Sequence, residues 1–215
     1  ERASRHHPKG RCHTRAVAEP SVLVAVLAGG LGRRLGGAKA TTELGGEPLL
    51  AYPLAAARAA GLDALVVAKP DTPLPELDAE VLIEPALPVH PLCGVLAALE
   101  HDRRDVLAVG CDMPFLAPAL LAWMAALDGP ALLEVDGRLQ PLPGRYPTAA
   151  RSRLAAAIRD GEPMRSMLAS IGAQVVGDAE LARFGEPRRL CFNVNEPADL
   201  ERARAMLADT GGGRA

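Results

Sequence analysis

Short aliphatic runs alternate with longer Ala- and Leu-rich segments over most of the chain. Four of the aliphatic runs predict buried strands, at 22–27, 64–68, 80–83 and 105–110. Apolar residues at helical spacing between these runs predict helices over 48–61 and 93–102. Strands that are apolar throughout are typical of a parallel sheet covered on both faces. The pattern therefore indicates an α/β domain rather than a sandwich or a helix bundle.

The second half of the chain is patterned differently. Asp136-Gly137 stands between two apolar runs and predicts a two-residue hairpin turn, which adds antiparallel strands to the parallel set. The other elements predicted there are helices at 118–127, 148–159 and 163–171, strands at 173–177 and 189–194, and a closing helix at 197–207. We therefore expect a mostly parallel mixed sheet with helices, in a single domain over 21–208.

The two ends of the chain lack this patterning. Residues 1–20 have no periodic apolar face and are expected to be a disordered leader, for which a tag remnant, an upstream start or a plain tail is favoured over a transit peptide. Residues 209–215 are expected to form a flexible tail. No signal-peptide core precedes the domain, and the apolar run at 22–27 is too short to span a bilayer, so the sequence predicts a cytoplasmic protein.

Charge and cysteine usage exclude some classes of protein. The formal net charge is −2, but the first 20 residues hold 5 Lys or Arg and only 2 Glu, which leaves 19 basic and 24 acidic residues beyond them. This lack of a basic surplus argues against a nucleic-acid partner. The four cysteines, at 12, 93, 111 and 191, form no C-x-x-C pair and predict neither a zinc site nor a thioredoxin-like motif.

The segment LAGGLGRRLGGAK, residues 27–39, directly follows the first predicted strand. Glycines in such a turn let backbone N–H groups converge on a ligand, and ligands of open α/β sheets bind at the carboxyl ends of the strands. Arg33, Arg34 and Lys39 add three cations, which favours a triphosphate site over a merely flexible turn. A P-loop is disfavoured because G-K-[ST] is missing, and a dinucleotide fold because the G-x-G-x-x-G spacing is wrong.

A second segment, VGCDMPFL at 109–116, holds a candidate metal ligand. Asp112 follows the strand at 105–110 and precedes Pro114, so its carboxylate is expected at the same edge of the sheet as the glycine loop. Mg²⁺ usually takes one or two carboxylates together with phosphate oxygens, which favours Asp112 as its anchor. The alternative is that Asp112 caps the helix at 118–127, although it lies far upstream for that role.

A third segment, CFNVNEPADL at 191–200, contains two asparagines. Asn193 and Asn195 are two residues apart on a predicted strand, so their side chains are expected to point the same way. Pro197 suits the first turn of the closing helix. The two asparagines are candidates for a second metal-shell or acceptor-binding role, and the alternative that either one caps the helix stays open.

In this order, strand-LAGG-x-G-x-R-x-G-x-x-K, D-M-P and F-N-V-N-x-P-x-D-L resemble the molybdenum cofactor guanylyltransferase family, within the wider group of nucleotidyltransferase-like proteins. The similarity runs from about Val22 to Leu207 and includes LGGEPLL at 44–50, LCG at 92–94 and LQPLPGRY at 139–146. It implies a three-layer α/β/α Rossmann-like domain of the GT-A type. It also implies an Mg²⁺-dependent enzyme that joins GMP from GTP to the phosphate of molybdopterin and releases pyrophosphate.

The resemblance also implies roles for single residues. It places Leu27, Ala28 and Gly29 against the nucleotide, Gly30 and Arg34 near its phosphates, Lys39 as the motif lysine and Asp112 as the metal ligand, with Arg34, Lys39 and Asp112 catalytic. The chain departs from some relatives after the second and third strands, where they carry Asn and Asp and it carries Ala68 and Lys69, then Glu84. Glu84 can still accept from the N1 and N2 donors of guanine and is the candidate base contact.

The expected reaction is in-line attack of the acceptor phosphate on the α-phosphorus, helped mainly by charge neutralisation and positioning. Of the five histidines, only His90 is expected to approach the pocket. Two alternatives stay open, namely a cytidylyl- or guanylyltransferase for another phosphorylated acceptor, and a non-catalytic nucleotide sensor on the same scaffold. The expected partners are an NTP and a small acceptor, with no nucleic acid or membrane, and the chain is expected to be a monomer.

Overall fold

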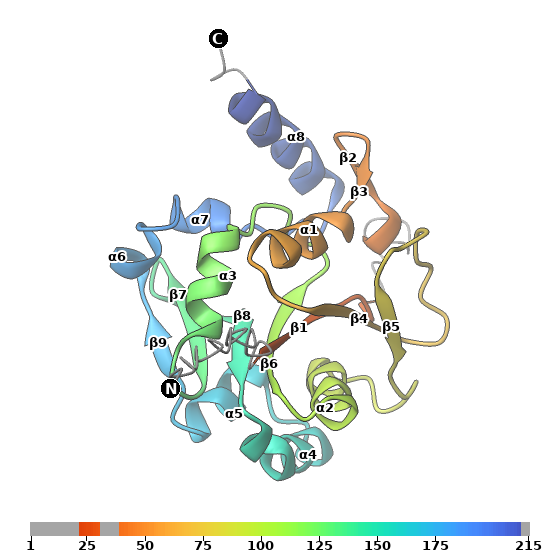
Figure 1. Ribbon diagram of the computed structural model, residues 1–215, viewed down its shortest axis with the longest axis vertical. Coiled ribbons are helices and arrows are strands. Elements are labelled where there is room, and N and C mark those ends of the chain that lie inside the picture. The colour runs from red at the N-terminus through yellow and green to blue at the C-terminus, as the bar shows by residue number, and fades with distance from the viewer. Residues whose placement is uncertain (1–21, 31–38, 212–215) are drawn as a thin grey trace, which may run out of the picture.

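The computed structural model describes residues 22–30 and 39–211 (Figure 1). Their main sheet has seven strands in the order β5-β4-β1-β6-β8-β7-β9. The strands are β1 Val22–Leu27, β4 Ala64–Ala68, β5 Glu80–Ile83, β6 Asp105–Gly110, β7 Ala131–Val135, β8 Arg138–Tyr146 and β9 Gln174–Val176. β8 runs antiparallel to both of its neighbours, and the other pairs are parallel. The predicted mostly parallel mixed sheet is confirmed.

Helices cover both faces of this sheet (Figure 1). Successive side chains of a strand point to opposite faces, so Val24 and Val26 of β1 enter one core while Leu23 and Ala25 enter the other. Helices α1 Ala51–Ala59 and α3 Pro118–Ala125 pack into the first core, and α2 Pro91–His101, α4 Arg151–Asp160 and α5 Met164–Ser170 into the second. The structure is therefore a three-layer α/β/α domain, as the resemblance implied.

The remaining elements are short or lie at the periphery. They are the 3₁₀ turns η2 Lys39–Thr41 and η3 Thr148–Ala150, the hairpin of β2 Glu43–Leu44 and β3 Glu47–Pro48, and the helices α6 Asp178–Leu181, α7 Pro187–Leu190 and α8 Pro197–Gly211. A small core of Leu44, Leu49, Val194 and Ala203 joins the β2–β3 hairpin to α8, the blue helix at the top of Figure 1. This core brings the segment before α8 close to η2.

The hairpin turn after β7 has the conformation that its sequence predicts. Asp136 and Gly137 both have positive φ, 52° and 71°, as a two-residue type I′ turn requires. Asp136 also forms an ion pair with Arg188, whose Nε lies 2.7 Å from Asp136 Oδ2. The turn therefore sets β8 antiparallel to β7, and β8 then pairs with the end of the parallel set at β6.

One predicted strand is wrong, and several predicted helix boundaries shift. The strand predicted at 189–194 is instead the end of α7 and an extended segment without strand pairing among the described residues, because Pro187 starts a helical turn whose N–H groups at 188 and 189 bond to the Glu186 side chain. The first helix begins at Ala51 rather than at residue 48, since the β2–β3 hairpin occupies the preceding residues. The closing helix runs on to Gly211, four residues past its predicted end at Leu207.

Within the part of the chain that the structure describes, no helix has both the length and the apolar character needed to cross a membrane.

Candidate active site

The site lies where four neighbouring parallel strands end. Leu27 of β1 pairs in register with Gly110 of β6 and with Val67 of β4, and Ala68 of β4 pairs with Ile83 of β5. The strands therefore end at nearly the same level of the sheet. The residues that follow them within two positions are Gly29 after β1, Lys69 after β4, Glu84 after β5 and Asp112 after β6.

Backbone hydrogen bonds extend the strand ladder one step beyond these ends. Ala28 N–H donates to the Val67 carbonyl at 2.8 Å, and Glu84 N–H donates to the Ala68 carbonyl at 2.9 Å. On the other side of β1, Cys111 N–H donates to the Leu27 carbonyl at 3.1 Å. The chain entering each loop is therefore held in place by the sheet, which fixes where the side chains beyond it begin.

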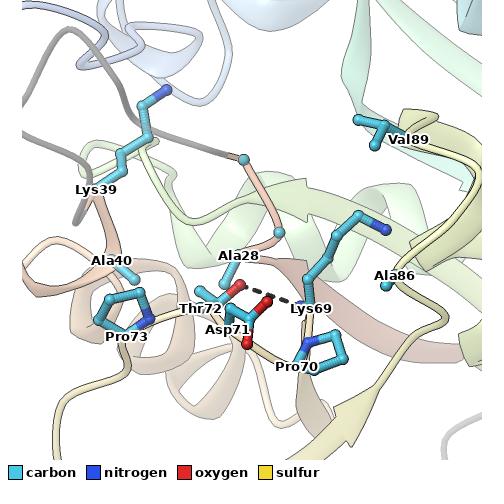
Figure 2. Close-up of a pocket in the computed structure, with 12 residues that line it drawn as sticks. Ala28, Lys39, Ala40, Lys69, Pro70, Asp71, Thr72, Pro73, Ala86 and Val89 are labelled. Carbon is cyan, nitrogen blue, oxygen red and sulfur yellow. Dashed lines mark hydrogen bonds between the residues drawn. The ribbon is translucent and has the colours of Figure 1, made fainter.

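Two adjoining cavities open at this edge. The larger, of about 300 Å³, is lined by Leu27, Gly29, Gly30, Lys39, Lys69, Glu84, Val89, His90, Pro91, Gly94, Gly110, Cys111, Asp112 and Leu142. The smaller, of about 200 Å³, shares Gly29, Gly30, Lys39, Lys69 and Val89 with it and is completed by Ala28, Ala40, residues 70–73 and Ala86 (Figure 2). Figure 2 shows the stems of Lys39 and Lys69 on either side of Ala28. A cleft of this size suits a small-molecule ligand.

Three glycines make room for side chains of the larger cavity. A Cβ at Gly29 would lie 2.6 Å from Glu84 Oε1, and one at Gly110 would meet the Asp112 carboxylate. A Cβ at Gly94 would lie 3.0 Å from Leu27 Cδ2 and 3.6 Å from Glu84 Oε2. The glycines are therefore needed for close approach to these side chains, and they leave the cavity walls without Cβ atoms.

Lys39 lies between two oxygen ligands from distant parts of the chain. Its Nζ is 2.6 Å from Asp112 Oδ2 and 2.7 Å from Asn195 Oδ1. The side chains of Lys39 and Asp112 are each only 15% exposed. The Asp112 carbonyl also accepts from Val194 N–H at 2.9 Å, which ties the segment after β6 to the segment before α8. One carboxylate and one amide oxygen thus converge on a single cation.

This geometry decides two alternatives that the sequence left open. Asp112 does not cap α3, because Ala117 precedes that helix without a side-chain cap and the Asp112 carboxylate bonds to Lys39. The start of α8 is held by Asp199, whose Oδ2 accepts from the N–H groups of Asn195 and Glu196 at 2.9 and 3.1 Å. The side chain of Asn195 accepts from Lys39 and is directed into the site.

Asn193 is placed differently from its neighbour. Its Nδ2 donates to the Cys191 carbonyl at 2.8 Å, whereas the Asn195 side chain accepts from Lys39. The strand predicted to carry Asn193 and Asn195 is not formed, and the two side chains have different partners. The structure brings Asn195 to Asp112 and does not bring Asn193 there.

Glu84 forms the acidic wall of the cleft opposite Asp112. Its side chain is 7% exposed, Lys69 Nζ lies 3.3 Å from its Oε1, and its Oε2 has no hydrogen-bond partner among the residues described. Burial raises the pKa of Glu84, and the positive charge of Lys69 partly offsets that rise. Lys69 also donates to the Pro85 carbonyl at 2.8 Å. Glu84 Oε2 is therefore a buried acceptor for which the described residues supply no donor.

His90 lines the larger cavity, where the sequence predicted that it could lie. Its Nδ1 accepts from Leu92 N–H at 3.1 Å, and its Nε2 is 2.9 Å from the Glu162 carbonyl. A neutral ring with its proton on Nε2 satisfies both contacts. His90 thus caps the start of α2 and has no nitrogen left for a ligand.

Most of the site residues predicted from the sequence lie together in the structure. Arg33 and Arg34 lie outside the described residues. Leu27, Ala28, Gly29, Gly30, Lys39, Glu84, Asp112 and Asn195 lie together at one edge of the sheet. The sequence marked Lys69 only as a departure from some relatives and Leu142 only as part of the matched segment at 139–146, and both line the larger cavity. The position of Lys69 directly after a parallel strand is the same signal that identified Asp112.

Both the sequence and the fold match known proteins. Residues 24–176 match the family described as "MobA-like NTP transferase domain". A molybdenum cofactor guanylyltransferase of Cereibacter sphaeroides is 36% identical over 197 residues, which cover 85% of this chain and 95% of that protein.

Two solved structures share the fold. The molybdopterin-guanine dinucleotide biosynthesis protein A of Archaeoglobus fulgidus is 25% identical with a TM-score of 0.73, over 87% of this chain and 99% of that one. The 2-C-methyl-D-erythritol 4-phosphate cytidylyltransferase of Thermus thermophilus is 26% identical with a TM-score of 0.63, over 88% and 99% of the two chains.

Proposed function

The chain belongs to the MobA-like NTP transferase family, and we propose that it transfers GMP from GTP to the phosphate of molybdopterin, releasing pyrophosphate. The observation that carries the proposal is the cleft between the glycine turn after β1 and the Lys39–Asp112–Asn195 cluster, with the buried Glu84 carboxylate on its opposite wall. A cleft with acceptors at one end and a cation-binding pair at the other suits a nucleoside triphosphate.

The nucleotide is proposed to bind along the β1 edge. Leu27, Ala28 and Gly29 would contact the nucleoside, while Gly30 and Arg34 would approach the phosphates. Glu84 would accept from guanine N1 and N2, because it lines the larger cavity and a carboxylate can accept from both donors. Guanine is favoured over cytosine by this contact, since an ionised carboxylate only accepts hydrogen bonds.

Asp112 and Asn195 are the residues proposed to hold a divalent cation, Mg²⁺ in this proposal. Their oxygens already converge on the Lys39 ammonium at 2.6 and 2.7 Å, so the donor set fits a cation. One carboxylate with few other protein ligands is typical of Mg²⁺ sites that are completed by phosphate oxygens and water. When bound, the ion would supply charge neutralisation at the phosphates.

The protein's own part in the reaction is to position two anions and to neutralise charge. An acceptor phosphate oxygen would bond to the α-phosphorus of GTP as the bond to the pyrophosphate oxygen breaks, with no proton transfer required of a side chain. Lys39 would turn from Asp112 and Asn195 toward the phosphates, and Arg34 would join it in stabilising the charge of the transition state. The backbone N–H groups at Gly29 and Gly30 would hold the phosphate chain.

The same scaffold carries a second candidate, cytidylyl transfer, because one of the similar structures is a cytidylyltransferase. The Glu84 carboxylate favours guanylyl transfer over cytidylyl transfer. The proposal includes action in the cytoplasm, as a monomer, on small molecules rather than nucleic acid or membranes.

The test is pyrophosphate release from GTP, CTP, ATP or UTP, each with Mg²⁺ and molybdopterin. We expect release with GTP that depends on both the acceptor and the metal. Release with CTP alone would replace guanylyl by cytidylyl transfer. Tight nucleotide binding without release under any combination would favour the non-catalytic sensor.

A further inference from the structure

Lys69 and Glu84 form an ion pair inside the nucleotide cleft. The two residues directly follow β4 and β5, which are neighbours in the sheet, so their side chains meet at 3.3 Å between Lys69 Nζ and Glu84 Oε1. The Pro85 carbonyl holds the same ammonium at 2.8 Å. The Lys69 backbone N–H donates to Thr72 Oγ1 at 3.1 Å, the dashed line in Figure 2. Both the backbone and the side-chain ammonium of Lys69 are therefore held in place.

The ionisation of Glu84 depends on Lys69 more than on any other described group. Burial raises the pKa of the carboxyl, and the Lys69 ammonium opposes that rise. From α2, the nearby Cys93 thiol has a raised pKa through burial and the charge of Glu84, so it brings no positive charge. His90 lines the same cavity, but both of its ring nitrogens are engaged elsewhere. The backbone of Gly29, on the β1 side, is uncharged.

The two protonation states of Glu84 match different bases. An ionised carboxylate offers acceptors only, and guanine is the one common base with two adjacent donors, N1–H and N2–H, on its pairing edge. A protonated carboxyl offers one donor beside one acceptor, which matches N3 and N4 of cytosine or N1 and N6 of adenine. Specificity is a difference between affinities, so the charge on Glu84 changes which nucleotide binds better.

We infer that Lys69 is a positioning residue for base selection: its ammonium keeps Glu84 an acceptor-only carboxylate and so favours guanine over cytosine. The inference rests on the proposed function, in which Glu84 contacts the base. The positive charge of Lys69, and not only the carboxylate of Glu84, then determines which base is preferred.

The experiment measures GTP and CTP binding by calorimetry, without acceptor, between about pH 6 and pH 8.5. The readout is the ratio of the GTP and CTP affinities. Both ligands carry the same triphosphate, so protonation of the triphosphate affects both affinities equally and cancels in the ratio. Lys69→Met keeps the stem and removes the charge, while Lys69→Arg retains the charge. Arg58→Met is the matched control, since it removes a cation that is 72% exposed on α1 and pairs with Asp78.

The native protein, Arg58→Met and Lys69→Arg are expected to prefer GTP. In Lys69→Met the pKa of Glu84 rises further, so the GTP to CTP ratio falls as the pH is lowered, by up to about tenfold per pH unit below that pKa. It recovers at high pH. Glu84→Gln lowers the ratio at every pH, and in the double variant with Lys69→Met the pH dependence disappears.

Two outcomes overturn the inference while leaving the proposed function in place. One is an unchanged ratio in Lys69→Met at every pH when Glu84→Gln loses its GTP preference. The other is a lower ratio in Lys69→Met that does not vary with pH, since Lys69 would then act without Glu84. Absence of any nucleotide binding by the native protein counts against the proposed function itself. If Lys69→Met fails to fold, as judged by thermal melting, Lys69→Gln carries the same expectation.

Discussion

We predict that adding a side chain at Gly29 destabilises the protein and weakens GTP binding, whereas adding one at Gly30 does not. A Cβ at position 29 would lie 2.6 Å from Glu84 Oε1 and 3.3 Å from Lys69 Cγ, whereas a Cβ at position 30 would meet no atom within 4 Å among the residues described. The Glu84 carboxylate is the end of a flexible side chain, but burial and its ion pair with Lys69 restrict where it can go. Gly29→Ala therefore has to displace a buried charge or the strand end itself.

We expect Gly29→Ala to lower the free energy of unfolding by about 1 to 3 kcal/mol, the usual cost of overpacking a filled site. Gly30→Ala should stay within about 0.5 kcal/mol of the native protein, as exposed substitutions usually do. Because Gly29→Ala moves the base contact, its affinity for GTP should also fall by at least about tenfold. Urea denaturation and calorimetry measure both quantities. Equal stability and equal GTP affinity in the two alanine variants would refute the packing argument.

Three further predictions address the metal ligand, the cap of α2 and one surface ion pair. Asp112→Ala should reduce Mg²⁺-dependent turnover about 100- to 1,000-fold with little change in GTP affinity measured without metal; undiminished turnover removes its assigned role. His90→Ala should cost about 0.5 to 2 kcal/mol of stability in urea denaturation because α2 loses its cap; an unchanged midpoint would show that the cap contributes nothing. Hydrogen bonding from Arg104 lowers the pKa of Asp102, and Arg104 Nη1 also lies 2.6 Å from Asp63 Oδ2. The stabilisation that Arg104→Met removes should therefore be complete above about pH 4 and should decrease as the pH falls through the native pKa of Asp102; a loss that is the same at all pH values would contradict this.

The layered core was predictable because burial on both faces leaves a continuous apolar pattern. β1, β4 and β6 are aliphatic runs whose residues are buried almost throughout, and each was predicted with its observed boundaries. The Asp136-Gly137 turn was predictable because few residue pairs accept positive φ at both positions. That residues 21–208 form one folding unit stays a prediction.

The failures have local causes. At 189–194 the apolar residues suggested a strand, but Pro187 and the Glu186 cap favour a helical turn, and no strand lies beside the following segment among the described residues. The role expected for Asn193 rested on the same strand and stays a prediction. Periodicity alone does not show whether a partner strand is available.

Part of the site depends on contacts between distant segments. Lys39 and Asn195 are 156 positions apart, and their hydrogen bond depends on the packing of α8 against the β2–β3 hairpin. Lys69 meets Glu84 because β5 lies beside β4, an order that the sequence did not specify. The motif residues could therefore be named individually, whereas the ion pair that we connect with base selection required the sheet order.

The central claim is that the chain transfers the α-phosphoryl group of GTP, with its guanosine, to a phosphorylated acceptor. The most direct measurement follows GTP labelled at the α-phosphorus and GTP labelled at the γ-phosphorus in parallel, with Mg²⁺ and molybdopterin. The α label is expected to appear in a molybdopterin–guanine dinucleotide and the γ label in pyrophosphate. Transfer of the γ label to the acceptor, or release of the γ label as inorganic phosphate without labelled dinucleotide, would contradict it.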